Sequence, residues 1–249
     1  MILITGATAG IGEATARIFA ENGQDLFLVG RRRDRLEKLS DELKQAHKVR
    51  VHTYALDISR SDEVRSFAQA SAKLLEETQV LINNAGLAKG LHPIQEVDSS
   101  DWDAMIDTNV KGVLAMSREV LPYFIKKGDG HIINLGSVAG HYNYPKGNVY
   151  CATKAAVHAL TECMRMDLLG TGVRVTEISP GMVETEFSVV RLGDQEKAKS
   201  VYQGMTPLTA RDIAETIFWC VKRPRHVNIQ EVVLYPTDQA SPTLVHRQK

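Results

Sequence analysis

The sequence predicts a doubly wound α/β fold, in which a seven-stranded parallel sheet carries helices on both faces. Seven short apolar runs recur along the chain and are rich in Val, Ile and Leu with few charges, as strands covered on both faces require. Longer segments between these runs repeat apolar residues at helical spacing. Such alternation makes successive strands parallel and packs the connecting helices against the sheet.

The expected strands follow one another at regular intervals along the chain. They are Ile2–Thr5, Asp25–Gly30, Val49–Ala55, Val80–Asn83, His131–Gly136, Val173–Ser179 and Gln230–Tyr235. Helical repeats between them include Leu36, Leu39, Leu43 and Ala46, then Val64, Phe67, Ala68 and Leu75, and later Met105, Ile106, Val113, Met116, Leu121 and Phe124. Since no internal repeat or linker interrupts the pattern, we expect a single domain over residues 1–249.

Two segments do not follow the alternation. Gly181–Gly204 comes after the sixth expected strand and has weak periodicity, and an excursion of this length is typical of an active-site lid. The tail Pro236–Lys249 is polar, so we expect an irregular surface or interface segment there.

Composition narrows the classes of function. Lys+Arg and Asp+Glu both total 30, so no net charge points to a nucleic acid or a membrane surface as partner. No apolar run approaches the roughly 18 residues of a membrane span, and no secretion signal precedes the first strand, so we expect a cytoplasmic protein. The three cysteines lack the spacing of a disulfide framework or a zinc site. We expect no metal site, and we expect buried apolar positions for Cys151, Cys163 and Cys220.

A glycine-rich turn joins the first strand to the first helix. It reads Thr5-Gly6-Ala7-Thr8-Ala9-Gly10-Ile11-Gly12, which is not the commoner G-x-G-x-x-G spacing. Glycines let the backbone approach a pyrophosphate, and a helix N-terminus supplies free N–H groups and partial positive charge. Because the turn opens the first β–α unit, we interpret it as a phosphate-binding loop rather than a plain tight turn.

Basic residues at the end of the second strand predict the cofactor. Arg31 and Arg32 stand about 20 residues after the glycines, where NAD-binding proteins often carry an acid for the ribose 2′-hydroxyl. A guanidinium can instead hold a 2′-phosphate through two parallel hydrogen bonds. We therefore expect NADP, and the alternative is a solvated basic helix start.

Three further stretches fall at the same edge of the predicted sheet. Asn83–Gly86 follows the fourth strand, Gly136-Ser137 ends the fifth, and Tyr150–Lys154 opens the next helix. Parallel sheets bind ligands beyond the carboxyl ends of their strands. Tyr150 and Lys154 are four residues apart, so one helix face presents both side chains.

This helix face indicates acid–base chemistry. A tyrosine near its ordinary pKa of about 10 is a poor base at neutral pH, and a nearby ammonium lowers that pKa. We expect Lys154 to let Tyr150 take a proton from a substrate hydroxyl as hydride leaves, or return it in reduction, while Ser137 donates to the substrate oxygen. Taken singly, Tyr150 could serve only in packing, Lys154 could be a solvated charge, and Ser137 could be a turn or cap residue. The prediction therefore depends on the combination of all three.

The same motifs resemble the short-chain dehydrogenase/reductase family from Ile2 to the last strand. The resemblance implies a Rossmann fold with strand order 3-2-1-4-5-6-7 and a helix kink at which Asn109 holds a water that links Lys154 to solvent. The matching positions are Thr5–Gly12, Asp57, Asn83–Gly86, Asn109, Ser137, Tyr150, Lys154 and Pro180-Gly181. The catalytic group it implies is Asn109, Ser137, Tyr150 and Lys154.

The resemblance also implies how the cofactor is held. Asp57 and Ile58 would contact the adenine, Lys154 would hold the nicotinamide ribose, and Pro180–Thr185 would reach the nicotinamide amide. The adenosine ribose would rest on the stretch after the fourth strand. Together with the loop and the arginines, the expected cofactor residues are Gly6, Thr8, Ala9, Gly10, Ile11, Gly12, Arg31, Arg32, Asp57, Ile58, Asn84, Ala85, Gly86, Tyr150, Lys154, Pro180, Gly181, Val183 and Thr185.

Longer phrases, such as MIDTNVKGVL, GHIINLGSVAG and HVNIQEVVLYP, are similar to NADP-dependent 3-hydroxy acid or serine dehydrogenases. This similarity implies oxidation of the 3-hydroxyl of serine, L-allo-threonine or 3-hydroxyisobutyrate by a homotetramer with the C-terminal tail at a subunit interface. A short hydroxy acid needs a cation for its carboxylate. Arg191 in the expected lid is the first candidate for this cation, and Lys146 is the second. Ser137 and Tyr150 are expected as further substrate contacts. The alternative is that Arg191 is only a solvated charge on the lid.

Two other functions are compatible with these residues. The first is a reductase for another ketone, carried by an acyl carrier protein or part of a sugar or steroid. The second is a regulator that senses NADP without catalysis, which the presence of all four catalytic residues disfavours.

Overall fold

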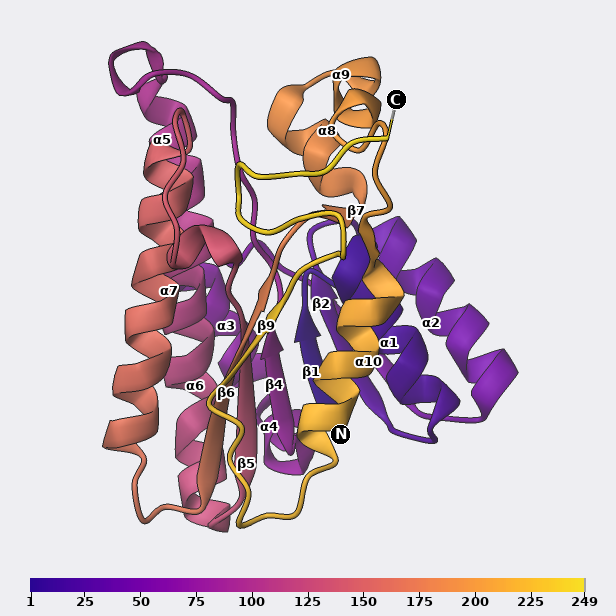
Figure 1. Cartoon of the computed structure of the whole chain (residues 1–249). Helices are drawn as coiled ribbons and strands as arrows, with labels where there is room; N and C mark the ends of the chain where they lie inside the picture. The colour runs from indigo at the N-terminus through magenta and orange to yellow at the C-terminus, as the bar shows by residue number, and fades with distance from the viewer. Residues whose placement is uncertain (249) are drawn as a thin grey trace.

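The computed structural model describes residues 1–248, and a parallel sheet runs through its centre (Figure 1). Its strands are β1 (Ile2–Thr5), β2 (Leu26–Gly30), β3 (Val51–Ala55), β4 (Val80–Asn83), β5 (Gly130–Leu135), β6 (Val173–Pro180) and β9 (Glu231–Leu234). The order across the sheet is β3-β2-β1-β4-β5-β6-β9, with every neighbouring pair parallel. Since β9 is the seventh strand of this sheet along the chain, the predicted order is confirmed.

Helices cover both faces of the sheet, as the alternating pattern predicted (Figure 1). One face carries α1 (Gly10–Glu21), α2 (Arg33–His47) and α10 (Ala210–Val221). The other carries α3 (Ser61–Ala70), α4 (Ala72–Glu77), α5 (Ser99–Ile106), α6 (Gly112–Lys127) and α7 (Asn148–Asp167). Each face has its own buried apolar cluster, one including Phe19, Leu36 and Ile217 and the other Phe67 and Phe124.

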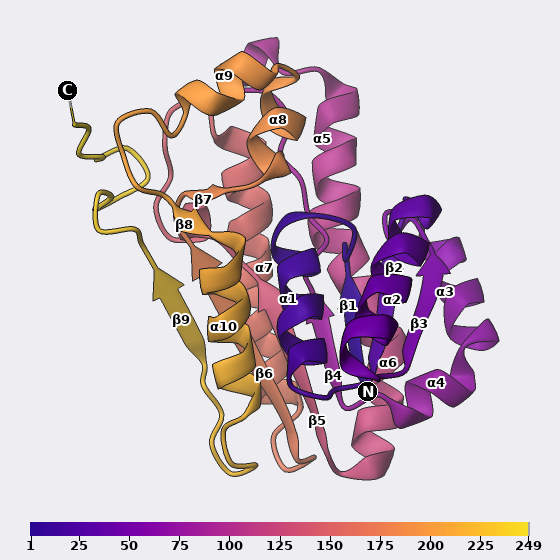
Figure 2. The same cartoon turned by 90° about the vertical axis from the view of Figure 1, so that its right-hand side faces the viewer.

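The segment expected to form a lid contains ordered short elements beyond the carboxyl ends of the strands (Figure 2). They are β7 (Val183–Glu184), α8 (Glu186–Leu192) and α9 (Gln195–Ser200), and β7 pairs with β8 (Leu208–Thr209). Side chains of Thr185 and Asp194 cap the two helices, and Gly193 lies between them with φ 66°. Helices this short give little periodicity, which explains why the sequence pattern was weak there.

The C-terminal tail lies against the end of the segment that contains α8 and α9. Gln248 N donates to Gly204 O at 2.7 Å, and the Arg247 guanidinium donates to the carbonyl groups of Val201 and Gln203. Lys249, the last residue of the predicted tail and domain, is outside the described residues.

The exposure of the cysteines corrects one prediction. Cys151 and Cys220 are buried as predicted, but Cys163 is exposed. The buried stripe of α7 runs through Tyr150, Lys154, Val157 and Thr161. Cys163, two positions after Thr161, is on the opposite side of the helix.

Among residues 1–248, no helix combines the length and apolar character that a bilayer-spanning segment needs.

His131 is a buried titratable residue on β5. It is 1% exposed, and its Nε2 lies 2.8 Å from Thr176 Oγ1. Because the Thr176 hydroxyl donates to Ile229 O, it must accept from Nε2–H, which leaves Nδ1 without a hydrogen-bond partner among the described residues. Burial, with a smaller contribution from the charge of Arg174, lowers the pKa of His131 to about 3.

We expect this histidine to make the protein less stable in acid. Below its unfolded pKa of 6.5, the unfolded chain takes up a proton that the folded protein does not accept until about pH 3. The free energy of unfolding should fall across that window by up to about 1.4 kcal/mol per pH unit from this residue. Urea unfolding between about pH 4.5 and 7 should therefore show a shallower fall in His131→Gln than in the wild type. The exposed control His226→Gln should keep the wild-type slope, and an unchanged slope in His131→Gln contradicts the prediction.

Candidate active site

The glycine-rich loop after β1 forms the floor of a cavity at the carboxyl edge of the sheet. Gly6 has φ 67°, and a Cβ at this position would come within 2.8 Å of Ala85 Cα. The Asn84 side chain donates to Thr5 O and Gly6 O at 2.9 and 3.2 Å, and Thr5 Oγ1 accepts from the N–H groups of Asn84 and Ala85. These contacts fasten the loop after β4 to the loop after β1, so that both present backbone rather than side chains to the cavity.

The N-terminus of α1 points at this cavity without a side-chain cap. Its N-cap residue is Ala9, which offers no acceptor to the N–H groups of the first turn. Uncapped N–H groups and the helix dipole favour an anionic group at this place. The arrangement therefore fits the phosphate binding predicted from the loop sequence.

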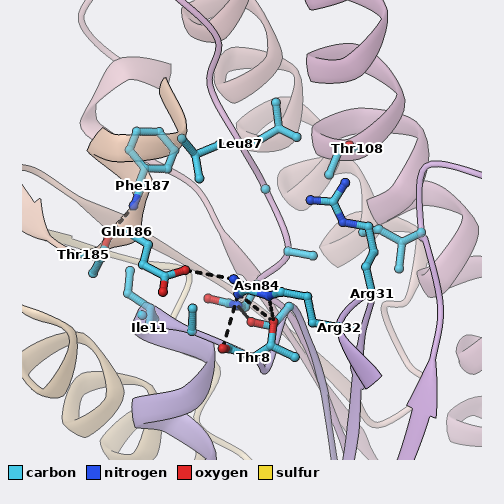
Figure 3. A pocket seen from close by; sticks show the side chains of 18 of the residues that line it. Thr8, Ile11, Arg31, Arg32, Asn84, Leu87, Thr108, Thr185, Glu186 and Phe187 are labelled. Atoms are coloured by element: carbon cyan, nitrogen blue, oxygen red, sulfur yellow. Dashed lines mark hydrogen bonds and ion pairs between the residues drawn. The ribbon is translucent and has the colours of Figure 1, made fainter. Parts of the chain in front are cut away.

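Arg31 and Arg32 leave the end of β2 in different directions (Figure 3). Arg32 donates to Thr8 Oγ1 at 2.9 and 3.1 Å and to Glu186 Oε2 at 3.0 Å. Arg31 has a side chain that is 67% exposed, and its nearest carboxylate, Asp57, is 4.0 Å away. Arg31 is thus the arginine whose guanidinium is available to an added anion, whereas Arg32 is already engaged by the protein.

Glu186, the first residue of α8, was not anticipated from the sequence. It pairs with Arg32 and with Arg35, whose Nη1 lies 2.8 Å from Glu186 Oε1. Both ion pairs connect the lid segment to the start of α2, and Figure 3 shows Arg32 and Glu186 together at the cavity. Nothing in the local sequence could indicate a contact between residues 154 positions apart.

The expected cofactor residues divide between two adjoining cavities. The first is lined by Gly6, Thr8, Ala9, Gly10, Ile11, Arg31, Arg32, Asp57, Ile58, Asn84, Ala85, Gly86 and Thr185. The second is lined by Tyr150, Lys154, Pro180, Gly181 and Val183, together with Ser137 and Arg191. Ile11, Asn84, Gly86, Thr185 and Phe187 line both cavities, so the two form one continuous site. Gly12 lines neither and packs in α1 against Gly6 and Asn84.

Ser137, Tyr150 and Lys154 meet in the second cavity. Tyr150 and Lys154 lie one turn apart on α7, and Lys154 Nζ is 5.9 Å from the centre of the Tyr150 ring. Lys154 Nζ donates to Leu135 O at 2.7 Å. Ser137 Oγ accepts from Ala139 N at 3.1 Å, which leaves its hydroxyl hydrogen to donate toward the cavity.

The titration behaviour of this pair differs from the expectation. Burial raises the pKa of the Tyr150 hydroxyl above its ordinary value, although a hydrogen bond with Ser137 and the charge of Arg191 act in the opposite direction. Burial also lowers the pKa of Lys154 to about 8, against the opposing charge of Glu177. The expected lowering of the Tyr150 pKa by Lys154 is therefore not produced by the protein groups alone, because both residues lie in a poorly solvated place.

Asn109 lies in a π-helical turn, Asp107–Lys111, between α5 and α6. This irregular turn is the helix kink that the family resemblance implied. The Asn109 side chain accepts from Leu87 N and donates to Leu87 O, both at 2.8 Å, and donates to Thr153 Oγ1 at 3.1 Å. It thereby holds the loop after β4 against α7.

Of the two candidates for a substrate carboxylate, only Arg191 lines the cavity. Its guanidinium carbon is 5.3 Å from the centre of the Tyr150 ring, and its Nη1 donates to Tyr144 Oη at 2.9 Å. Nε donates to Gly90 O at 3.2 Å. Lys146 is exposed with φ 66° and does not line either cavity, since the turn before α7 directs it away.

Several cavity residues were not predicted individually. Tyr144, Phe187, Tyr202 and Gln239 all line the second cavity. Tyr202 donates to Val183 O at 2.8 Å, and Gln239 accepts from Met182 N at 2.8 Å. Tyr202 and Gln239 come from the segment after α9 and from the C-terminal tail, whose positions only the folded chain defines.

Known proteins resemble this chain over nearly its whole length. It is 48% identical over 242 residues to sulfoacetaldehyde reductase 2 of Chromohalobacter salexigens, covering 96% of this chain and 95% of that protein. It is 46% identical over 250 residues to the NADP-dependent 3-hydroxy acid dehydrogenase of Salmonella typhi, covering 99% of each. The solved closed form of serine dehydrogenase complexed with NADP+ superposes with a TM-score of 0.92 at 43% identity, covering 99% of both chains.

The sequence profile of one family spans most of the fold described above. The profile described as short chain dehydrogenase matches residues 1–196, which include the glycine loop, Ser137, Tyr150 and Lys154. The chain therefore belongs to the short-chain dehydrogenase family.

Proposed function

We propose that this protein is an NADP-dependent oxidoreductase that transfers a hydride between NADP and the 3-hydroxyl or 3-oxo carbon of a short hydroxy acid, such as serine, L-allo-threonine or 3-hydroxyisobutyrate. One observation carries the proposal: Arg191 enters the same cavity as Ser137, Tyr150 and Lys154. An acid–base group and a cation a few ångströms apart suit a small substrate that has a reactive oxygen and a carboxylate.

Tyr150 is the proton-transfer residue in this proposal. In reduction its hydroxyl gives a proton to the carbonyl oxygen of the substrate, and in oxidation its phenolate removes the proton of the substrate hydroxyl. Ser137 donates to the same substrate oxygen and stabilises the charge that develops on it. Arg191 orients the substrate by holding its carboxylate through two N–H groups.

NADP would lie across both cavities. The glycine loop and the N-terminus of α1 would hold its pyrophosphate, Arg31 its 2′-phosphate, and Asp57 and Ile58 would contact its adenine. Lys154 and the stretch Pro180–Thr185 would position the nicotinamide end. When bound, NADP supplies or accepts the hydride, and its oxidised ring adds positive charge that favours the Tyr150 phenolate.

A second candidate substrate is a short sulfonate aldehyde. The observation that favours it is the relative at 48% identity named sulfoacetaldehyde reductase 2. A guanidinium can bind the oxygens of a sulfonate as well as those of a carboxylate, so Arg191 suits both substrates. Reductases for carrier-linked, sugar or steroid ketones use the same catalytic residues and are the alternatives that the test must exclude.

A panel of substrates, followed by NADPH absorbance, tests the proposed function. We expect turnover of serine, L-allo-threonine or 3-hydroxyisobutyrate with NADP, in preference to NAD, and far less activity on carrier-linked, sugar or steroid ketones. Sulfoacetaldehyde with NADPH distinguishes the second candidate. Activity confined to large ketones, or equal efficiency with NAD, contradicts the proposal.

Two neighbouring arginines provide the matched control for the cofactor. Arg31→Ala should lose roughly 10- to 100-fold in kcat/KM for NADP and little for NAD, because a charge-assisted pair with the 2′-phosphate is removed. Arg33 is exposed and does not line the cavity, so Arg33→Ala should keep the preference for NADP.

We further propose a single catalytic domain over residues 1–249, a lid at 181–204, and a cytoplasmic homotetramer. Free cysteines are compatible with a reducing compartment. Exposed apolar side chains that assembly could cover include Leu114 and Ile125 on α6, Met166 on α7, and Leu244 in the tail. Light scattering of the purified protein measures the number of subunits directly.

A further inference from the structure

Two histidines and two glutamates converge on the far side of the catalytic residues. His141 follows the turn that Ser137 begins, His158 lies on α7, Glu177 on β6 and Glu231 on β9. One donor atom from each lies within 4.8 Å of the others. None of the four lines the cofactor or substrate cavity.

We propose that these four side chains bind one divalent cation of the Zn²⁺ class, at a site separate from the cofactor and the substrate. Two imidazole nitrogens and two carboxylate oxygens are ligands that Zn²⁺ takes in tetrahedral sites. Tetrahedral bonds of about 2.1 Å place neighbouring ligand atoms about 3.4 Å apart. The four donors therefore need to move inward by about 1 Å at most, which side-chain rotation can supply.

Charge balance supports a dication at this place. Glu177 is 1% exposed, and the side chains of His141, His158 and Glu231 are between 19 and 27% exposed. The two carboxylates bring two negative charges into a poorly solvated environment, which is costly unless they are compensated. One divalent cation neutralises both carboxylates, and the partial exposure of the other three side chains leaves it a path of entry.

The surrounding residues already orient the ligands. Ser179 Oγ donates to Glu177 Oε1 at 2.9 Å, which leaves Oε2 toward the cluster. His158 directs Nδ1 toward Glu177 at 2.8 Å, while its Nε2 lies 4.0 Å from Glu162 Oε2. A second carboxylate behind a metal-binding histidine, and a hydrogen bond behind a metal-binding carboxylate, are regular features of metal sites.

A site without metal would consist of two His–Glu hydrogen-bonded pairs. His141 Nε2 lies 2.5 Å from Glu231 Oε1, and the two imidazole rings stand edge to face with centroids 4.5 Å apart. Such pairs account for the separate contacts. They do not explain why the two pairs lie next to each other, with four donor atoms from four different elements close together. A single shared cation explains this arrangement.

The location gives the cation a structural role next to catalysis. His141 ends the turn that begins at Ser137, and His158 is one helical turn beyond Lys154. Glu177 occupies the space in which a Cβ at Gly136 would lie, directly beside Ser137. A cation bound here would cross-link the turn and the helix of the catalytic group to β6 and to the edge strand β9.

Metal titration of the full-length protein, after treatment with a chelator, tests the site. We expect one Zn²⁺ per chain by calorimetry, with a Kd of about 1 µM or tighter. We also expect a rise in Tm of about 3 °C or more with excess Zn²⁺, and the visible absorption of tetrahedral Co²⁺ when Co²⁺ replaces it. The absence of stoichiometric binding overturns the proposal and leaves two hydrogen-bonded pairs.

Variants locate the bound metal. His158→Asn and Glu231→Gln should each weaken Zn²⁺ binding at least about tenfold and remove the tetrahedral Co²⁺ spectrum, with circular dichroism showing that they fold. Should His158→Asn not fold, Glu231→Gln on the partly exposed edge strand decides alone. Cys163→Ser, which removes the exposed thiol of α7, and the exposed His226→Asn should bind as the wild type does. Undiminished binding in Glu231→Gln, or its loss in either control, overturns the assignment.

Discussion

Tyr150→Phe should lower kcat about 10²- to 10⁴-fold at saturating NADPH, the range in which a positioned acid or base contributes. The ring stays in place, but the hydroxyl that exchanges a proton with the substrate oxygen is gone. Pre-steady-state and steady-state NADPH absorbance measure the loss, and cofactor fluorescence checks that NADPH still binds. A folded, NADPH-binding variant that retains more than about a tenth of the activity contradicts the assigned role.

Tyr144→Phe is the matched control, because it removes a second hydroxyl from the same cavity. Its loss should stay within about tenfold, as for one hydrogen bond to Arg191. The pH profile gives a further check. Since burial raises the pKa of Tyr150, reduction should persist through neutral pH, whereas oxidation, which needs the phenolate, should increase with pH.

Arg191→Ala should lower kcat/KM for a short hydroxy acid roughly 10- to 100-fold, mainly through KM, because a charge-assisted pair with the carboxylate is lost. The methyl ester of the same acid should be affected much less, since it carries no carboxylate. Arg191→Lys should recover part of the activity by restoring the charge without the planar fork.

Lys146→Ala is the control for the loss of kcat/KM expected in Arg191→Ala. Lys146 carries the same charge at a position that does not line the cavity, so its loss should leave kcat/KM unchanged. Equal losses of acid and ester in Arg191→Ala would mean that Arg191 supports the lid through Gly90 O and Tyr144 Oη rather than holding the substrate.

The regular part of the fold was predictable because its signals are local. Buried parallel strands must be apolar on both faces, and the helices between them repeat at 3.6 residues, so strands such as β1 and β4 begin and end at the predicted residues. Cys163 was misplaced because composition says that cysteines are often buried, whereas its position around α7 decides its exposure.

By itself, the sequence determined the alternation of strands and helices, the glycine loop, and the association of Ser137, Tyr150 and Lys154, because motifs at the carboxyl ends of parallel strands must share one edge of the sheet. The strand order was implied only by the resemblance to the family. Only the tertiary structure shows that Arg191, and not Lys146, lines the substrate cavity. It alone also shows the ion pair between Arg32 and Glu186. The same holds for the cluster formed by His141, His158, Glu177 and Glu231. These contacts join segments far apart in the chain, and the direction of each side chain follows from packing rather than from its neighbours in sequence. The raised pKa of Tyr150 has the same origin, since burial is a property of the assembled cavity.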